Sequence, residues 1–180
     1  MKETPSEYTM RMLGYLEGQD PLTVQARTPA KLERLLRAAP RARLGKRPAP
    51  QKWSVGEILA HLADAEIVIG WRIRQILGAP GTSLQAFDQD AWVAACHYDT
   101  REPARSVEQF RTLRQGNLAL LKSLTAEQWK QHGMHTERGP ETIEHIVRMT
   151  AGHDLNHTKQ IMGILSSTAA GSGRRAASGR

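Results

Sequence analysis

The stretch from residue 142 to residue 165 constrains the fold most, because its side chains repeat with the period of an α-helix. The positions that define one face are Ile143, Ile146, Val147, Thr150, Ile161, Ile164 and Leu165. On the same helical wheel His153 and His157 fall inside this face, one turn apart, whereas His145 falls outside it. The pattern predicts a long helix that turns two histidines towards the rest of the protein.

Two inward histidines at positions i and i+4 have two interpretations. Their imidazoles lie about 6 Å apart on one side of a helix, so both can bind a single metal ion. Alternatively, they are core histidines whose nitrogens are satisfied by hydrogen bonds. We favour the metal site because His153 and His157 occupy adjacent turns, with an acidic residue between them.

A second long helix is predicted to begin near residue 54. Ser54 and Glu57 have the spacing of a capping box, and the apolar stripe that follows continues to about Leu77, before Gly and Pro residues at 78–81. His61 lies at the edge of this stripe. It is therefore either a third inward imidazole or a structural histidine.

The rest of the chain is also predicted to be helical or irregular. The other helical segments expected are 6–18, a piece opened by Thr28-Pro29 and ended by Ala39-Pro40, a short helix at Gln89–Ala95, a helix from Ser106 to about Leu124, and a turn of helix from Thr125 to Trp129. Residues 82–100 read as a long connection, and no segment alternates like a β-strand. Residues 132–140 are expected to form a polar loop, and residues 166–180, rich in Gly, Ser, Ala and Arg, a disordered tail.

These segments predict an all-α fold, a four-helix bundle over residues 1–165 with a long crossover between its second and third helices. With one cysteine, Cys96, any metal must rely on histidine and carboxylate ligands. No secretory segment and no apolar run of membrane-spanning length is visible, so we expect a soluble, cytoplasmic protein without a membrane partner.

The net charge of +7 raises the question of nucleic-acid binding. Residues 27–52 hold nine Lys and Arg against one acid, Glu33, which gives +8 for this segment alone. The segment lacks interleaved aromatic residues for stacking on bases, and it is separate from the histidines. We expect a solvated helix and loop there and no nucleic-acid partner.

Several segments resemble the DinB-like (DinB/YfiT) superfamily. They are Lys52–Glu66 followed by Trp71–Arg74, Ala86–Trp92, Arg114–Asn117, His135–Gly139 and Ala151–His157. The resemblance implies an up-down-down-up four-helix bundle that binds one divalent ion, usually zinc or nickel, through three histidines. Carried onto this sequence, these ligands are His61, His153 and His157.

The resemblance also bears on activity. Members with known activity transfer low-molecular-weight thiols such as bacillithiol or mycothiol, or use such a thiol in isomerisation, and others are named as metal-dependent hydrolases. Many are dimers, so a small-molecule substrate and a homodimer are implied. The thiol transferases have a further histidine near the end of the final motif, where this chain has Asn156 and Gln160. This departure puts the thiol substrate in doubt rather than the metal.

Three neutral imidazoles leave a divalent ion its full charge and at least one open position, which can activate a water or a thiol. Asp64 and Asp154 are candidates for orienting the ligand histidines, and His135, Glu137 and Arg138 for the mouth of the site; each can equally be a solvated surface group. Asn117 lies in the middle of an apolar stripe. It either fixes helix register or points at the central site.

Three functions compete at this point. The first is a metal-dependent thiol transferase or hydrolase. The second is a zinc protease, but His153–His157 has aspartate where His-Glu-x-x-His has glutamate, and no histidine follows it as a downstream ligand. The third is a non-catalytic, dimerising module in which the metal is structural. An open coordination position favours chemistry, because structural zinc usually has a fourth protein ligand.

Overall fold

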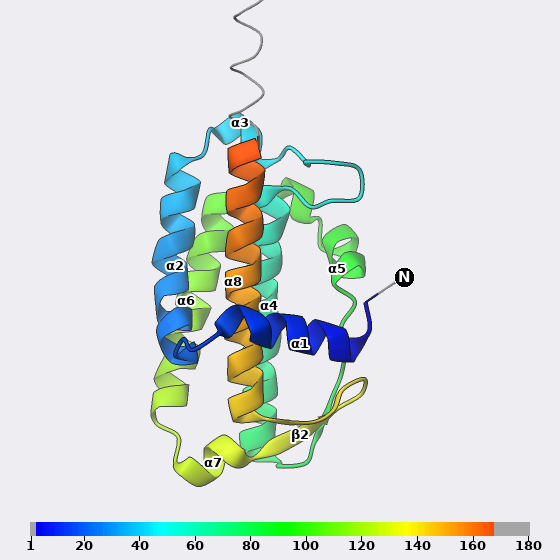
Figure 1. Cartoon of the computed structure of the whole chain (residues 1–180), viewed down its shortest axis with the longest axis vertical. Helices are drawn as coiled ribbons and strands as arrows, with labels where there is room; N and C mark the ends of the chain where they lie inside the picture. The colour runs from blue at the N-terminus through cyan, green and yellow to red at the C-terminus, as the bar shows by residue number, and fades with distance from the viewer. Residues whose placement is uncertain (1–2, 168–180) are drawn as a thin grey trace, which may run out of the picture.

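The computed structural model describes residues 3–167, and its four longest helices form a bundle (Figure 1). They are α2 (Pro21–Ala38), α4 (Val55–Gly78), α6 (Pro103–Lys122) and α8 (Ile143–Ser167). Each of α4 and α2 packs against both α6 and α8. The chain runs up in α2, down in α4 and α6, and up in α8, which confirms the predicted topology.

Shorter elements connect and cover the bundle. They are α1 (Pro5–Leu16), α3 (Arg41–Leu44), β1 (Ser83–Leu84), α5 (Gln89–Ala95), the 3₁₀ turn η1 (Tyr98–Thr100), α7 (Ala126–Lys130), β2 (His132–His135) and β3 (Gly139–Thr142). The crossover from α4 to α6 contains β1, α5 and η1. α5 begins and ends where the sequence predicted.

The helix α1 lies across the bundle and packs on α8 (Figure 1). Its fully buried Met12 sits over Gly152 of α8, where an added Cβ would lie 1.9 Å from the Met12 carbonyl oxygen. Glycine therefore permits backbone-to-backbone contact at this crossing. The contact places α1 beside the two histidines that follow Gly152.

Two helices start three or more residues before their predicted starts, and α1 ends at Leu16, two residues before its predicted end at residue 18. α6 begins at Pro103, three residues before the predicted start at Ser106, and proline suits the first turn of a helix. α2 is one helix from Pro21, capped by Asp20, and it passes through Pro29 without a break. Pro29 cannot donate to the carbonyl of Gln25, and that carbonyl instead accepts a hydrogen bond from Arg114 Nη1 at 3.2 Å.

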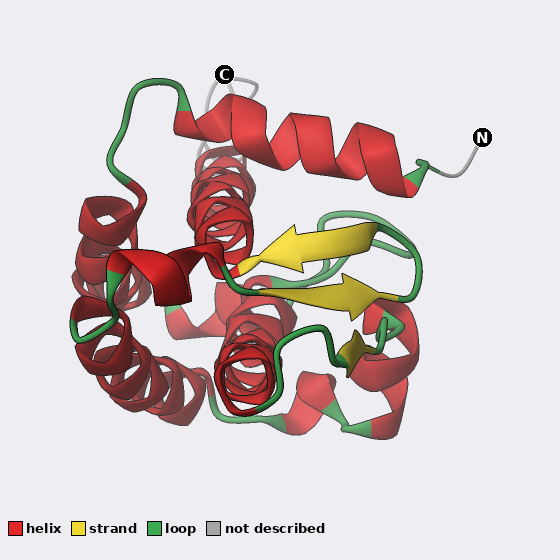
Figure 2. Cartoon of the chain, turned by 90° about the horizontal axis from the view of Figure 1, so that it is seen from below, coloured by secondary structure: helices red, strands yellow, loops and turns green. Residues whose placement is uncertain are grey.

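The expected polar loop at 132–140 is wrong, because residues 132–142 contain a β-hairpin. β2 pairs antiparallel with β3, with His135 opposite Gly139, and parallel with β1, with Leu84 beside His135. Figure 2 shows the hairpin between α1 and the crossover. Gly133 is needed here, since a Cβ at that position would lie 2.7 Å from the buried Leu84 side chain. The hairpin turns His135 inward.

Among the described residues, the two largest apolar clusters lie one at each end of the bundle. One cluster contains Leu32, Leu44, Val55, Ile58, Leu59, Leu62, Val107, Phe110 and Ile161, and the other Ile73, Ile76, Leu84, Leu121, Ile143, Ile146 and Val147. On α4, α6 and α8 the residues between the two clusters include buried charged and polar side chains. This central polar layer is where the predicted site residues lie.

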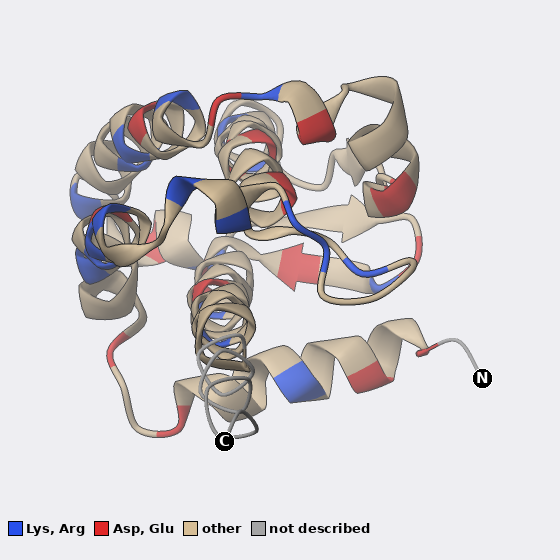
Figure 3. Cartoon of the chain, turned by 90° about the horizontal axis from the view of Figure 1, so that it is seen from above, with Lys and Arg blue, Asp and Glu red and all other residues tan. Residues whose placement is uncertain are grey.

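Three other sequence expectations concern the surface and the termini. The basic residues of 27–52 are spread over α2, α3 and the loop that follows α3 (Figure 3). Within residues 3–167 no helix is both long and apolar enough to cross a membrane. Ser166 and Ser167 of the expected tail complete α8, and the remainder of that tail lies outside the described residues.

Candidate metal centre

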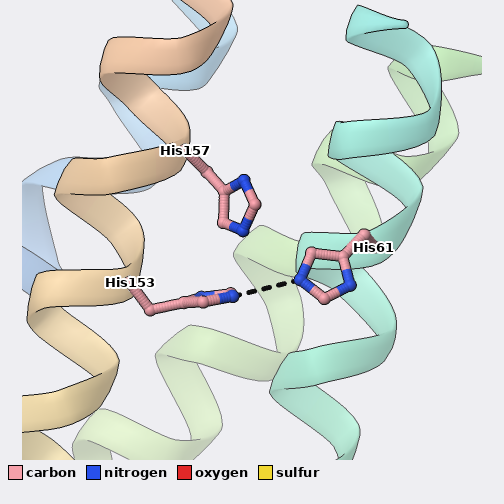
Figure 4. A group of neighbouring side chains, drawn as sticks. All are labelled: His61, His153 and His157. Carbon is pink, nitrogen blue, oxygen red and sulfur yellow. Dashed lines mark hydrogen bonds between the residues drawn. The ribbon is translucent and has the colours of Figure 1, made fainter. Parts of the chain in front are cut away.

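The three predicted histidines come together in the polar layer of the bundle (Figure 4). His61 projects from α4, and His153 and His157 project from successive turns of α8. One ring nitrogen of each histidine lies within 4.8 Å of the other two, and the Nε2 atoms of His61 and His153 are 3.0 Å apart. All three side chains are buried.

The arrangement fits a metal ion of the size of zinc. Two nitrogens on one tetrahedral zinc ion, each about 2.0–2.1 Å from it, are separated by about 3.3 Å. The separation of His61 from His153 is close to this value, and a ring nitrogen of His157 lies within 4.8 Å of both. The Nδ1 of His157 faces Gln160 Oε1 at 2.9 Å and donates to it, which leaves Nε2 unprotonated for a metal.

The surroundings keep the three imidazoles neutral. Burial holds the pKa of His61 and of His153 well below the usual value, and the positive form of neighbouring histidines lowers it further. Burial also lowers the pKa of His157 to about 4, against the opposing effect of Gln160. Trp53 stacks parallel to His157, with ring centroids 6.3 Å apart, and covers one side of the cluster. Neutral, buried imidazoles are the form that a metal ion binds.

Asp154 and Asn117 belong to a buried ionic network rather than to the histidines. Both oxygens of Asp154 accept from the guanidinium of Arg114, which also donates to Glu66 at 2.8 Å. Asn117 Nδ2 donates to the other Glu66 oxygen at 2.8 Å. The network joins α4, α6 and α8 next to the cluster, and the Gln25 carbonyl of α2 accepts from the same arginine.

Asp64 is also engaged elsewhere. Its two oxygens accept from the hydroxyl of Tyr98 at 2.9 Å and from Arg101 Nη1 at 2.8 Å. These contacts fasten the crossover to α4. The one orienting contact to a histidine of the cluster that the structure describes comes from Gln160, for which the sequence predicted no such role. Its position three residues after His157 on the same helix was the available signal.

A cavity of about 870 Å³ reaches the cluster at His153. Its walls come from α1, α4, the crossover, the hairpin and α8, and the predicted mouth residues His135, Glu137 and Arg138 all line it. Glu137 is exposed, whereas Arg138 forms an ion pair with the buried Glu141 at 2.6 Å. The hairpin thus contributes one wall of the approach to the histidines.

His135 lies within that wall as a neutral imidazole. Its Nδ1 accepts from the backbone N–H of Glu137 at 3.2 Å, and its Nε2 lies 3.3 Å from Arg72 Nη2. Burial, Arg138 and Arg72 lower the pKa of His135 to about 4. Both ring nitrogens therefore face donors, which opposes protonation. Arg72 also lines the cavity, and no role was predicted for it from the sequence.

Residues 26–161 match the family model of the DinB superfamily. The chain belongs to the DinB superfamily. This DinB-superfamily chain is 24% identical to the Bacillus subtilis protein named "Putative metal-dependent hydrolase YfiT" over 141 residues, which are 78% of this chain and 79% of YfiT. It is 27% identical over 115 residues to "Putative metal-dependent hydrolase OB0413" of Oceanobacillus iheyensis, covering 63% of this chain and 65% of that protein, just under two thirds of its length.

The fold of a solved relative agrees with these matches. The structure titled "YfiT from Bacillus subtilis is a probable metal-dependent hydrolase with an unusual four-helix bundle topology" superposes with a TM-score of 0.78 at 20% identity. The superposition covers 93% of this chain and 91% of YfiT. It establishes the four-helix bundle of this DinB-superfamily member.

Proposed function

We propose that this chain is a metal-dependent enzyme that binds one divalent ion, zinc or nickel, through His61, His153 and His157. The observation that carries the proposal is the convergence of three buried imidazoles, one of which, His153, lines a cavity. Asp64 and Asp154, the nearest acids in sequence, are held by other residues. Within residues 3–167 no fourth His, Cys, Asp or Glu joins the cluster, which leaves a coordination position for a ligand.

When bound, such an ion lowers the pKa of a coordinated water to about 7 and keeps a coordinated thiol deprotonated. The residues of the chain then have separate tasks. Gln160 holds the tautomer of His157, Trp53 covers one side of the cluster, and the hairpin and α1 wall the approach. The names of the two relatives support hydrolase-type chemistry, with activated water as the nucleophile.

Thiol S-transfer is the second candidate. The positions where thiol transferases resembling this chain carry a further histidine hold Asn156, which accepts from Arg11, and Gln160, which is bound to His157. Neither side chain can act as a base. A zinc protease is disfavoured further, because Asp154, which would have to be the general base, is bound by Arg114 on both oxygens.

Cobalt substitution tests the proposal. Cobalt bound at an open three-histidine site should change its visible spectrum when azide or a small thiol is added. The spectrum should stay constant if the coordination is closed by protein, and the non-catalytic alternative would then hold. A panel of esters, amides and thiol acceptors, compared with His157→Ala and with His145→Ala as the matched control, assigns the reaction. The homodimer and the lack of a nucleic-acid partner stay predictions.

A further inference from the structure

Arg72 carries a buried charge without a carboxylate at contact distance. Its side chain lines the cavity and is 8% exposed. The guanidinium donates to the backbone carbonyl of Gln85, lies beside His135 and sits over the ring of Phe87. No carboxylate among residues 3–167 lies within 4.0 Å of it, although a buried charge is costly unless it is paired.

The acids that line the cavity are paired with other residues or exposed to solvent: Glu3 is paired with Arg11, and Asp90 is exposed. Glu141 is paired with Arg138, and Asp88 caps α5 by accepting from the backbone N–H of Ala91. Glu137 is exposed. His135 is neutral and offers Arg72 no negative charge. The negative charge that would pair with Arg72 therefore has to come from an anion that enters the cavity.

The position of Arg72 on α4 relates it to the histidine cluster. Arg72 follows His61 by 11 residues, a rotation of three full turns plus about 20° around the helix axis, so both residues lie on one face of α4. Their backbones are about 16 Å apart along the axis. Ala65 and Ile69 lie between them and line the cavity. The guanidinium of Arg72 lies against the Gln85 carbonyl and beside His135, and the cavity extends from this wall to His153.

We propose that Arg72 binds a carboxylate of the substrate, whose apolar middle part lies over Ala65 and Ile69 and whose reactive group reaches the cluster at His153. A single negative charge fits best, because Glu137 and Glu141 line the same cavity. The placement of the reactive group at the histidine cluster rests on the proposed function. The carboxylate subsite does not, and it can be tested without a metal.

Calorimetric titration of the full chain with hexanoate and with 1-hexanol tests the subsite. A charge-assisted contact predicts that hexanoate binds on the order of tenfold more tightly than the alcohol. Arg72→Gln should abolish this preference, Arg72→Lys should keep part of it, and Arg148→Gln, which removes an exposed arginine of α8, should leave it unchanged. Equal binding of the two probes by the unaltered protein overturns the proposal whether or not the variants fold. Tighter binding of hexyl phosphate than of hexanoate overturns the assignment to a carboxylate.

A second titration separates this inference from the proposed function. Cobalt-loaded protein is titrated with 6-mercaptohexanoate and with 6-mercapto-1-hexanol, and the cobalt spectrum reports the thiol at the ion. The carboxylate form should bind more tightly, and Arg72→Gln should remove the difference while the thiol spectrum remains. If both thiols bind to cobalt equally well, the placement of one substrate between Arg72 and the ion is wrong. If hexanoate is selected in the first titration but no thiol reaches cobalt, the proposed function is wrong and the subsite stands.

Discussion

Replacing Gly152 by alanine should detach α1 from α8. The added Cβ would lie 1.9 Å from the carbonyl oxygen and 2.6 Å from the carbonyl carbon of Met12, whereas an ordinary contact begins at 3.4 Å. α1 would therefore have to move by about 1.5 Å, the difference between 3.4 and 1.9 Å. The obstacle is backbone, so a side-chain rotation cannot relieve the clash.

The magnitude follows from three contributions. Overpacking of a tight contact costs about 1–3 kcal/mol. Loss of the buried positions of Met12 and Leu16 costs up to about 2–3 kcal/mol each if α1 undocks. Alanine stabilises a helix interior by about 1 kcal/mol relative to glycine, which offsets part of the cost. Because undocking of α1 relieves the overpacking, we expect a net destabilisation of about 3–5 kcal/mol, or about 6–20 °C in Tm for a chain of this size.

Thermal and urea unfolding measure the effect, with Gly163→Ala as the matched control. Gly163 lies on the same helix, and no described atom lies within 4 Å of the point that an added Cβ would occupy, so alanine should stabilise the protein by about 1 kcal/mol there. Proteolysis between α1 and α2 should also accelerate in Gly152→Ala alone. If the two variants are equally stable, the close crossing of α1 over α8 is not as described.

Three further predictions concern the site. Gln160→Leu should weaken metal binding about 10–100-fold, measured by competition with a chelator, because His157 loses the acceptor that orients its ring. The control Asn156→Leu should leave the metal affinity unchanged. Equal losses in the two variants would contradict the orienting role of Gln160. NMR titration of His135 should give a pKa of about 4. An unfolded histidine titrates near 6.5, so between pH 6.5 and 4 the unfolded state binds more protons than the folded state, and the free energy of unfolding falls as the pH falls through this range. A measured pKa near 6.5 would refute the buried contact. Asp154→Asn should destabilise the protein to urea by about 3 kcal/mol, because Arg114 loses a buried partner, and a loss under about 1 kcal/mol would mean that the pair is solvated.

The long helices were predictable because their determinants are local. The capping box of Ser54 and Glu57 forms as expected at the start of α4, and the face containing His153 and His157 is buried in α8. The hairpin was not predictable from alternation, because its strands are four residues long and include Gly133. Short strands of this kind are fixed by the β1 partner and by packing, not by their own composition.

The site was predictable only in part, for a related reason. The spacing of His153 and His157 is visible in one helix, but the pairing with His61 depends on the packing of α4 against α8, 92 residues away in sequence. The continuity of α2 through Pro29 likewise depends on a hydrogen bond from a distant arginine. Side chains with long-range partners could be placed on a helical face from the sequence, but their contacts could not.

The central claim is that the three histidines bind one metal ion, and the metal content of purified protein tests it most directly. Elemental analysis should find about one zinc or nickel per chain, and His157→Ala should lose most of it. His145→Ala makes the same substitution on the same helix outside the cluster and should retain the metal. Full occupancy in His157→Ala, or equal loss in the two variants, would contradict the claim.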